Sequence, residues 1–355
     1  MSVELPRRVD TVYLGGGTPS LLAPELLGQL FAAMREEFNF ERNAEITVEC
    51  APGQIADATL DALDAVGVNR VSLGVQSFID REAQVSGRLH SRKTVLGDVR
   101  RLRKSGITNL SLDLIAGLAG QTAASWDESL AVLVDCGTPH ASVYMLEVDE
   151  DSRLGREMLG GGARYYAEQV PLDDVIAQMY AVAIEKLGEA GLRQYEISNF
   201  SQPGFESRHN LRYWQRRPYL GLGLDASSAL HAAESDESSF VLRSTTTDEL
   251  EAFLAGTGTA ENSWLSPARQ HEEAWFLGLR LNAGVDVTAL ESEFGVEMVG
   301  SALDAVRRLE RDGLLVSYGN TVRLTKRGRL LSNDVFQEFL ELEKSERGTV
   351  GVAAQ

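Results

Sequence analysis

The sequence is poor in cysteine and has no long apolar run. Its 355 residues include two cysteines, Cys50 and Cys136, which lie 86 positions apart. A disulfide framework or a cysteine-spaced metal site needs more thiols at closer spacing, so the sequence predicts neither. No apolar run approaches the roughly 18 to 20 residues of a membrane span, and the N-terminal MSVELPRR lacks the apolar segment of a signal peptide. We therefore expect a cytoplasmic protein without a transmembrane segment.

Positive charge is also scarce. The chain has 34 lysines and arginines against 52 aspartates and glutamates, which gives a formal net charge of −18. Proteins that bind nucleic acid neutralise phosphates with clustered basic residues, so this balance argues against nucleic acid as the main partner. The length and the hydrophobic fraction of 43% suit a globular chain with two or three domains and a large core.

From residue 11 to about residue 144, short apolar runs alternate with helical patterns. Parallel strands linked by helices produce this alternation, and glycines after most of the helical patterns are typical C-terminal caps. The predicted strands are 11–14, 45–49, 70–75, 109–115 and 141–146, and the predicted helices are 24–38, 56–66, 93–105 and 124–136. This pattern predicts an α/β fold. Five units suit a doubly wound sheet or a complete or partial barrel, and periodicity does not choose among them.

The segment 10–22, DTVYLGGGTPSLL, joins the first predicted strand to a helical pattern through three glycines. Glycines at such a turn let the backbone approach a ligand closely, and their N–H groups can face a carboxylate, an amine or a phosphate. The spacing matches neither a dinucleotide fingerprint nor a Walker A loop. The segment is therefore either the rim of a ligand site or a plain strand-to-helix turn.

Polar residues stand at the ends of three predicted strands. Glu49 closes the second strand, Gln76 follows the third and Asp113 lies inside the fourth. The carboxyl ends of parallel strands line a ligand site in α/β folds, and a carboxylate in an apolar strand needs a partner or water. Gln76 could equally cap a loop. Arg88 could hold a ligand carboxylate in a bidentate pair or be a solvated surface arginine.

A second dense stretch, residues 194–214, reads QYEISNFSQPGFESRHNLRYW. It combines many polar hydrogen-bonding groups with aromatic residues. His209 could be an axial ligand to haem iron or a general acid, with Tyr213 and Trp214 as flat apolar walls. A single histidine is more often structural, and that alternative stays open.

The C-terminal part has the pattern of a separate small domain. Helical patterns at 268–281, 287–294 and 301–312 precede a predicted hairpin that turns at 318–320, and a closing helix is predicted at 332–342. Three helices and a hairpin resemble a winged helix. The acidity of the chain and the ordinary charge of LDAVRRLERDG favour a packing or partner role over DNA binding.

Together, these stretches resemble the radical S-adenosylmethionine (SAM) superfamily, in the branch that contains oxygen-independent coproporphyrinogen III oxidase and the haem chaperone HemW. The resemblance runs from about Val9 to Leu342 and rests on the ordered set GGGTPS, GVNRVSLGVQSF, GRLH, LDLIAGL, YEISNF, SRHNLRYW and LSNDVF. The HNxxYW segment resembles the chaperone group rather than the oxidase.

The resemblance implies a fold and its boundaries. The fold would be a partial (βα) radical-SAM-type barrel that lacks its first unit, followed by a small winged-helix-like α+β domain. The implied divisions are residues 1–230 for the barrel with the HNxxYW segment, 231–265 for a connecting segment, 266–342 for the C-terminal domain and 343–355 for a flexible tail.

The resemblance also implies a function and its residues. The function would be that of a HemW-like haem chaperone, which binds haem and transfers it to an acceptor protein, with a respiratory protein as one candidate acceptor. SAM, a 4Fe–4S cluster and an electron donor would belong to the complete form. His209 would contact haem, and the residues that would contact SAM are Gly16, Gly17, Thr18, Glu49, Gln76, Arg88 and Asp113. The alternatives are radical decarboxylation of coproporphyrinogen III and a binding remnant without a cluster.

One departure from the family is large. The family carries a CxxxCxxC motif before the glycine stretch, and its three cysteines hold the cluster whose unique iron binds SAM. This chain has only fourteen residues before Gly15, and Cys50 and Cys136 have neither the number nor the spacing to replace the motif. The start is either truncated or that of a degenerate member. We favour truncation because the SAM-side residues remain together and a barrel without its first strand would expose an edge.

Overall fold

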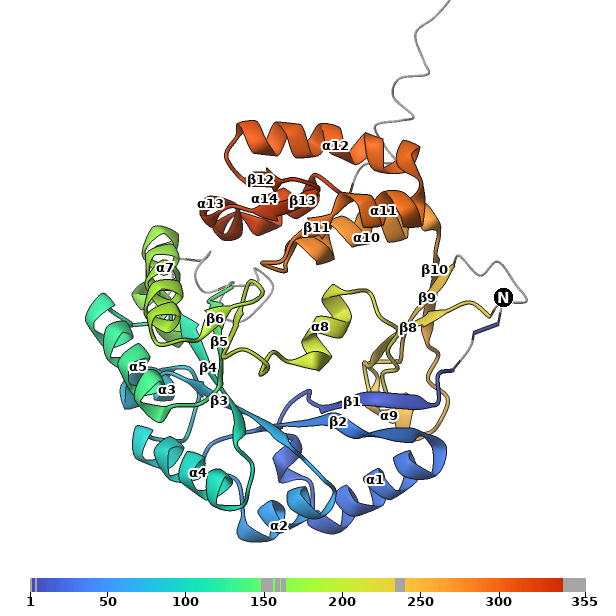
Figure 1. Cartoon of the computed structure of the whole chain (residues 1–355). Helices are drawn as coiled ribbons and strands as arrows, with labels where there is room; N and C mark the ends of the chain where they lie inside the picture. Colours follow the sequence, from blue (N-terminus) through green and yellow to red (C-terminus); the bar gives the residue numbers. More distant parts are fainter. Residues whose placement is uncertain are drawn as a thin grey trace, which may run out of the picture. The chain divides into compact units, whose positions relative to one another are not determined.

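The repeated units form one seven-stranded sheet in the order β1-β2-β3-β4-β5-β7-β6 (Figure 1). Strands β1 to β5 are parallel, and β7 pairs antiparallel with both β5 and β6. The strands are β1 Arg8–Leu14, β2 Asn39–Cys50, β3 Arg70–Gln76, β4 Asn109–Ala116, β5 His140–Met145, β6 Arg193–Gln194 and β7 Asn199–Ser201. The five predicted strands are confirmed, and β2 begins six residues earlier than predicted.

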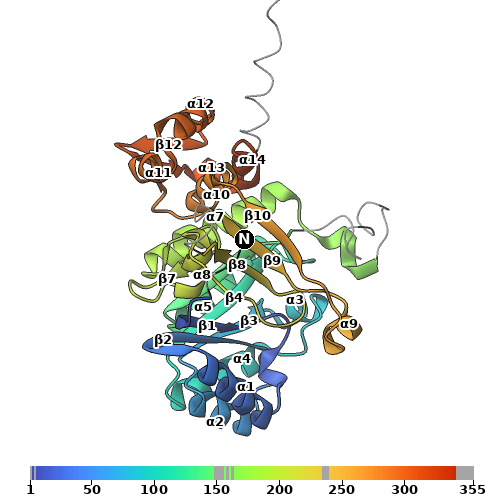
Figure 2. The same cartoon turned by 90° about the vertical axis from the view of Figure 1, so that its right-hand side faces the viewer.

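The helices of these units pack on one face of the sheet, as Figures 1 and 2 show for α1, α2 and α4. Leu110, Leu112 and Leu114 of β4 point to this face and are fully buried. The intervening Ser111 and Asp113 point to the other face. The helices are α1 Pro24–Glu37, α2 Asp57–Ala65, α3 Asp80–Val85, α4 Arg92–Lys104, α5 Ala123–Cys136 and α7 Asp173–Glu189, with short 3₁₀ helices at Pro19–Leu21 and Arg164–Gln169.

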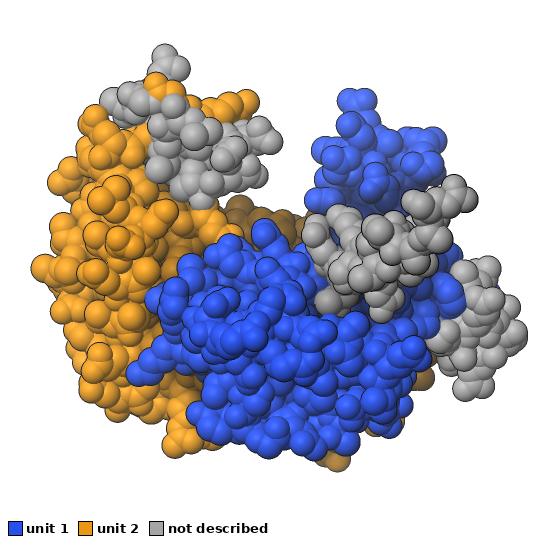
Figure 3. All heavy atoms as spheres, turned by 90° about the horizontal axis from the view of Figure 1, so that it is seen from above, with its two compact units in different colours: residues 1–6, 210–355 blue, residues 7–209 orange. Residues whose placement is uncertain are grey.

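The computed structural model describes residues 2–3, 5–147, 156, 160, 164–233 and 240–340. The chain divides into two compact units, which Figure 3 colours separately. The first unit is Arg7–His209, and the second is Met1–Pro6 with Asn210–Gln355. The tail expected at 343–355 lies outside the described residues. Among the residues that the structure describes, no helix has the length and apolar character to cross a membrane.

The second unit contains a three-stranded antiparallel sheet in the order β10-β9-β8. Its strands are β8 Ser227–His231, β9 Val241–Thr245 and β10 Glu261–Leu265, and the short helix α9 Leu250–Leu254 lies between β9 and β10 in sequence. Sequence analysis expected a connecting segment at 231–265. The described part of that segment instead supplies two strands of this sheet.

The C-terminal domain has the predicted three helices followed by a hairpin. Its elements are α10 Pro267–Leu279, β11 Val285–Asp286, α11 Val287–Phe294, α12 Val296–Arg311, β12 Leu315–Tyr318, β13 Thr321–Leu324, α13 Lys326–Leu330 and α14 Ser332–Gln337. The sheet order is β11-β13-β12, and Asp286 caps α11 by accepting the N–H groups of Thr288 and Ala289. Helix α12 begins five residues before the predicted start.

Trp275 is the centre of the core of this domain. Its side chain is fully buried, its ring stacks on Phe339 at 5.1 Å, and its indole N–H donates to Nε2 of His271 at 2.9 Å. An accepting Nε2 requires a neutral imidazole, and burial, together with the nearby Arg216, lowers the pKa of His271 from 6.5 to about 4. The core of the domain therefore depends on a neutral histidine.

We predict that acid destabilises the protein through His271. Between pH 6.5 and 4 the unfolded chain binds a proton at this position that the folded chain excludes, so stability is lost as the pH falls. The loss attributable to this group is about 2 kcal/mol between pH 7 and pH 5. Denaturant unfolding at both pH values should show that His271→Gln loses less unfolding free energy in acid than the wild type does. The control His231→Gln, at an exposed position, should lose as much as the wild type. Equal losses in all three proteins would contradict the assignment.

Candidate functional site

The face of the sheet opposite the helices carries polar side chains on consecutive parallel strands. Strand pairing places Glu49 of β2 opposite Ser72 of β3, and Gly74 opposite Asp113 of β4. Asp113 is in turn paired with Ser142 of β5. Because these residues follow the two-residue period of a strand, they share one face, which we call the polar face. The predicted Glu49 and Asp113 therefore belong to one continuous surface.

The glycine turn adjoins this face at the end of β1. Gly16 and Gly17 have φ angles of 82° and 115°, a region that favours glycine, and Thr18 precedes the 3₁₀ helix. A Cβ added to Gly15 would lie 2.7 Å from Cε1 of Tyr13 and 3.1 Å from Oε1 of Glu49. The backbone at Gly15 thus runs directly against these two side chains.

Tyr13 connects the glycine turn to Glu49. Its hydroxyl donates to Oε1 of Glu49 at 2.7 Å. Burial and the neighbouring Glu49 carboxylate raise the pKa of Tyr13 far above its usual value, so the hydroxyl keeps its proton for this bond.

Gln76 and Arg88 meet at the end of β3. Gln76 has a φ of 65°, unusual for a residue other than glycine, and the N–H of Ser77 donates to the carbonyl of Val75 at 2.8 Å to close a tight turn. A Cβ at Gly74 would lie 3.3 Å from Nε2 of Gln76 and 3.8 Å from a terminal nitrogen of Arg88. The structure therefore brings the predicted amide and guanidinium together, and the left-handed turn explains why the amide lies over Gly74.

Asp113 accepts hydrogen bonds from serines of two strands. Ser72 donates to Oδ2 at 2.8 Å and Ser111 donates to Oδ1 at 3.0 Å. Burial raises the pKa of Asp113, while the bonds from the serines and the nearby Arg70 act in the opposite direction. Asp113 is held in place by neutral donors, which favour the ionised form that burial opposes.

His209 lies against β1. Its Nδ1 is 3.1 Å from the hydroxyl oxygen of Thr11, and its ring stacks on Tyr13 with 4.9 Å between centroids and 19° between planes. The ring is half-buried. Since Tyr13 also donates to Glu49, this tyrosine contacts both the predicted haem residue and a predicted SAM residue.

Side chains of the sheet, and Tyr195 from the segment between β6 and β7, hold the segment 205–209 that carries this histidine. The N–H groups of Arg208 and His209 donate to the two carboxylate oxygens of Glu45 at 3.1 and 3.0 Å. Glu45 is only 7% exposed. Arg70 donates to the carbonyl of Phe205 at 3.4 Å, and the N–H of Ser207 donates to the hydroxyl of Tyr195 at 3.1 Å. The segment is positioned by the polar face.

The aromatic residues that follow His209 on helix α8, Arg208–Trp214, have partners in the second unit. Tyr213 packs edge-on against Tyr219 at 4.7 Å, and the Arg280 guanidinium lies 4.3 Å from the centre of a Trp214 ring. The prediction that Tyr213 and Trp214 form walls around a haem is not tested by these contacts.

The two cysteines do not form a metal centre. Cys50 and Cys136 are buried, unpaired thiols, and burial raises the pKa of Cys50 to about 12. In the described part of the chain, no group of three or more histidine, cysteine, aspartate or glutamate side chains is placed to hold a metal ion. The donors present therefore do not fit a 4Fe–4S cluster.

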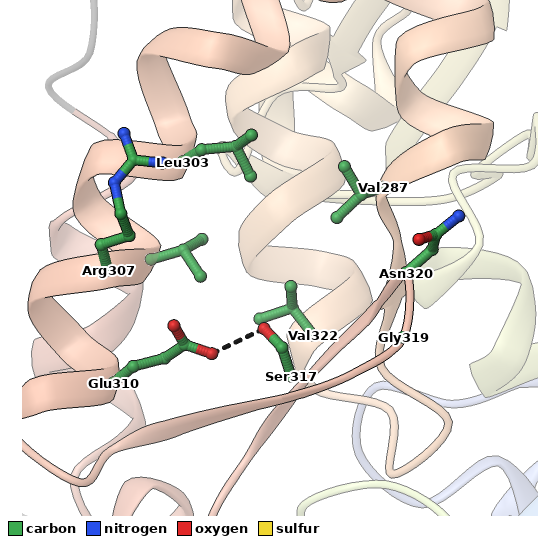
Figure 4. Close-up of a pocket in the computed structure, with 9 residues that line it drawn as sticks. Val287, Leu303, Arg307, Glu310, Ser317, Gly319, Asn320 and Val322 are labelled. Atoms are coloured by element: carbon green, nitrogen blue, oxygen red, sulfur yellow. Dashed lines mark hydrogen bonds between the residues drawn. The ribbon is translucent and has the colours of Figure 1, made fainter.

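A cavity of about 240 Å³ lies in the C-terminal domain between α11, α12 and the hairpin (Figure 4). Figure 4 shows the Glu310 carboxylate directed at Ser317, whose hydroxyl donates to it at 2.6 Å. None of the residues that sequence analysis assigned to SAM or haem lines this cavity. Its lining residues are Val287, Leu303, Val306, Arg307, Glu310, Ser317, Gly319, Asn320 and Val322.

Sequence reasoning missed the side chains that connect the predicted residues, namely Tyr13, Glu45, His140 and Tyr195. For Tyr13 and Glu45 the signal was an alternation of polar residues within strands that were interpreted as apolar runs. Thr11 and Tyr13 alternate with Val12 and Leu14, and Glu45 and Glu49 alternate with apolar neighbours in the same way. Tyr195 lies in the stretch 194–214, which sequence analysis singled out without giving this residue a role.

We predict that Glu45→Gln releases the segment that carries His209. A glutamine oxygen can still accept, but its NH₂ group would face a second backbone N–H in place of a carboxylate oxygen. Amide exchange of Arg208 and His209, followed by NMR, should accelerate about tenfold or more, as expected for a lost charge-assisted bond. The control is Glu41→Gln, on the same strand as Glu45, which removes a surface ion pair with Arg8. It should leave the exchange rates of both amides unchanged. Unchanged exchange in Glu45→Gln would show that the carboxylate does not hold the segment.

Comparison with known proteins places the chain in a family. The model of the radical SAM superfamily matches residues 3–133, and that of the HemN C-terminal domain matches residues 265–331. The Lactococcus lactis protein named heme chaperone HemW is 33% identical over 336 residues, which cover 94% of this chain and 85% of that protein. Heme chaperone HemW of Bacillus subtilis is 32% identical, with 94% and 86% covered.

The fold has a solved counterpart. The structure of coproporphyrinogen III oxidase (HemN) from Escherichia coli superposes with a TM-score of 0.77 at 21% identity, covering 94% of this chain and 78% of that one. The mixed α/β architecture with its small C-terminal domain is therefore confirmed. From the relatives at more than 30% identity, the chain belongs to the radical SAM superfamily, in the family of the heme chaperone HemW.

Proposed function

We propose that this protein is a haem chaperone, which binds haem through His209 and transfers it to an acceptor protein. The observation that carries the proposal is the fixed geometry of His209, whose ring contacts Thr11 and Tyr13 and whose backbone N–H is held by Glu45. The relatives named heme chaperone HemW support the same function. A respiratory haem protein is a candidate acceptor, and the cytoplasm is the proposed location.

Thr11 would tune the proposed ligand. When Nδ1 of His209 donates its proton to the Thr11 hydroxyl, the lone pair of the neutral ring is on Nε2, the nitrogen that would bind iron. A histidine ligand whose other nitrogen is hydrogen-bonded has a fixed tautomer and ring orientation. Stacking on Tyr13 fixes the plane of the ring from a second direction.

We predict that His209→Ala weakens haem binding and changes the Soret band. The axial nitrogen would be lost, and affinity should fall by about tenfold or more, since loss of a ligating or strongly bound partner costs on the order of 1.5 kcal/mol or more. Haem titration followed by absorbance measures both effects. His231→Ala, which removes an exposed histidine of β8, is the matched control and should titrate like the wild type. The proposal fails if His209→Ala binds haem with the wild-type affinity and spectrum.

We also propose that the ends of β1 to β4 bind SAM. Gly16, Gly17 and Thr18 with Glu49 would hold the amine of the methionine part. No atom lies within 4 Å of a Cβ built on Gly16 or Gly17, so the backbone there has room for a ligand. A carboxylate such as that of Glu49, together with backbone carbonyl groups, can accept the hydrogen bonds that an amino-acid ammonium donates.

The remaining SAM contacts would come from β3 and β4. Arg88 and Asp113 would hold the carboxylate and the ribose hydroxyls, and Gln76 would add an amide beside Arg88. The closeness of Gln76 and Arg88 above Gly74, and the pairing of Gly74 with Asp113, support one common site. When bound in a complete member of the family, the cluster supplies an iron that ligates SAM. The described residues of this chain would offer SAM polar side chains and the backbone of the glycine turn.

We predict weak binding of SAM to this chain. Without an iron ligand, the polar contacts should give a Kd of roughly 100 μM or weaker by calorimetry. Arg88→Gln should remove the measurable heat because the bidentate donor is lost. Arg92→Gln, whose exposed guanidinium pairs with Glu128, serves as the control and should bind like the wild type. A Kd near 1 μM would contradict the view that SAM depends on an iron ligand.

A further inference from the structure

A continuous chain of hydrogen bonds runs through the polar face from the segment 205–209 to Asp113. The N–H of Ser207 donates to the hydroxyl oxygen of Tyr195 at 3.1 Å, and that oxygen is 3.0 Å from Nε2 of His140. Nδ1 of His140 is 2.9 Å from the hydroxyl oxygen of Ser111, which donates to Oδ1 of Asp113 at 3.0 Å. Four hydrogen bonds therefore connect a backbone amide to a carboxylate.

With Asp113 ionised, the donors and acceptors of these four hydrogen bonds take one order. An ionised Asp113 is an acceptor, so the single proton of Ser111 is directed at it and not at Ser142, whose Oγ lies 3.3 Å away. Nδ1 of His140 is then the donor to Ser111. A neutral imidazole with its proton on Nδ1 accepts at Nε2, so the hydroxyl of Tyr195 donates there. Every proton in the chain points toward Asp113.

The surroundings keep the protons in this order. His140 is 1% exposed, and its burial, with the positive Arg70 nearby, lowers its pKa well below the usual value. Burial raises the pKa of Tyr195, which therefore retains its proton. Neutral His140 and neutral Tyr195 are the forms that the chain requires.

The two ends of this series of hydrogen bonds lie in the two parts of the proposed site. Asp113 belongs to the proposed SAM residues, and Ser207 is followed directly by Arg208 and His209. We propose that His140 and Tyr195 are positioning residues that couple the state of Asp113 to the segment that carries His209. This inference rests on the proposed function for its meaning, because His209 is the proposed haem ligand.

The coupling follows from the single proton that each member can donate. A ligand hydroxyl or ammonium that donates to Oδ1 of Asp113 competes with the Ser111 hydroxyl. Buried hydrogen bonds in series polarise one another. A weaker bond from Ser111 to Asp113 therefore weakens the bonds through His140 and Tyr195, including the one that the Ser207 amide donates to Tyr195. Ser72 bonds the other oxygen, Oδ2, and is outside the chain.

The first test is the tautomer of His140 in the wild-type chain. Nitrogen-15 NMR of the histidine side chains distinguishes a proton on Nδ1 from one on Nε2 and from an imidazolium. The proposed series of hydrogen bonds requires the Nδ1–H form of His140 at pH 7. An Nε2–H form or a charged ring would overturn the proposal, without any dependence on haem or SAM.

The second test compares two serines that donate to the same carboxylate. Ser111→Ala interrupts the chain, whereas Ser72→Ala removes an equivalent bond outside it. Amide exchange at Ser207 should accelerate about fivefold in Ser111→Ala, the factor of one typical hydrogen bond, and stay unchanged in Ser72→Ala. Equal effects of the two variants, or no effect of Ser111→Ala, would overturn the proposal.

The third test is a double-mutant cycle on haem affinity with Ser111→Ala and Tyr195→Phe. If the chain acts as a unit, each variant weakens haem binding by about fivefold and the double variant weakens it no further. Tyr180→Phe, which removes another buried tyrosine hydroxyl, is the control and should bind haem normally. Additive effects would overturn the proposal. If His209→Ala leaves haem binding unchanged, the proposed function fails, and the tautomer and exchange tests still decide the coupling.

Discussion

The structure of the first unit depends on the pairing of buried polar groups on the polar face. A carboxylate, imidazole or hydroxyl removed from water without a partner costs several times the gain of one hydrogen bond, so each such group must find a donor or an acceptor nearby. Glu45, Asp113 and His140 meet this requirement through different partners, which are backbone amides, serines, and a serine with a tyrosine. The site is a consequence of these pairings, because they leave little freedom for the segment that holds His209.

Much of the fold followed from the sequence because its strands and helices have regular periods. The five parallel strands and the helices between them were predicted from apolar runs, and the winged-helix-like pattern of the C-terminal domain was predicted from three helices and a hairpin. The short α3 and the sheet of β8, β9 and β10 were not predicted, since β9 and β10 consist largely of polar residues that become strands through their pairing. Period and propensity carry little information about such strands.

The polar residues at the strand ends of the candidate site were predictable, whereas the side chains that link them by hydrogen bonds were not. Glu49, Gln76 and Asp113 stand out because polar residues interrupt or close apolar strands. Strand pairing brings Glu49 and Asp113 to one face, and the left-handed turn at Gln76 brings its amide over Gly74. Tyr13, Glu45 and Tyr195 act through partners that are distant in sequence, such as the 163 positions between Glu45 and Arg208. A single sequence contains no local sign of contacts at that separation.

The two cysteines have a consequence for experiments on this protein. Cys50 and Cys136 are 4% and 7% exposed, and burial raises the pKa values of both thiols. Alkylating reagents attack the thiolate, so both native residues should react slowly while the protein is folded. A cysteine introduced on the surface could then carry a fluorophore or a spin label selectively, without prior removal of the native thiols. Distances between labelled positions would be measurable in the otherwise unmodified chain.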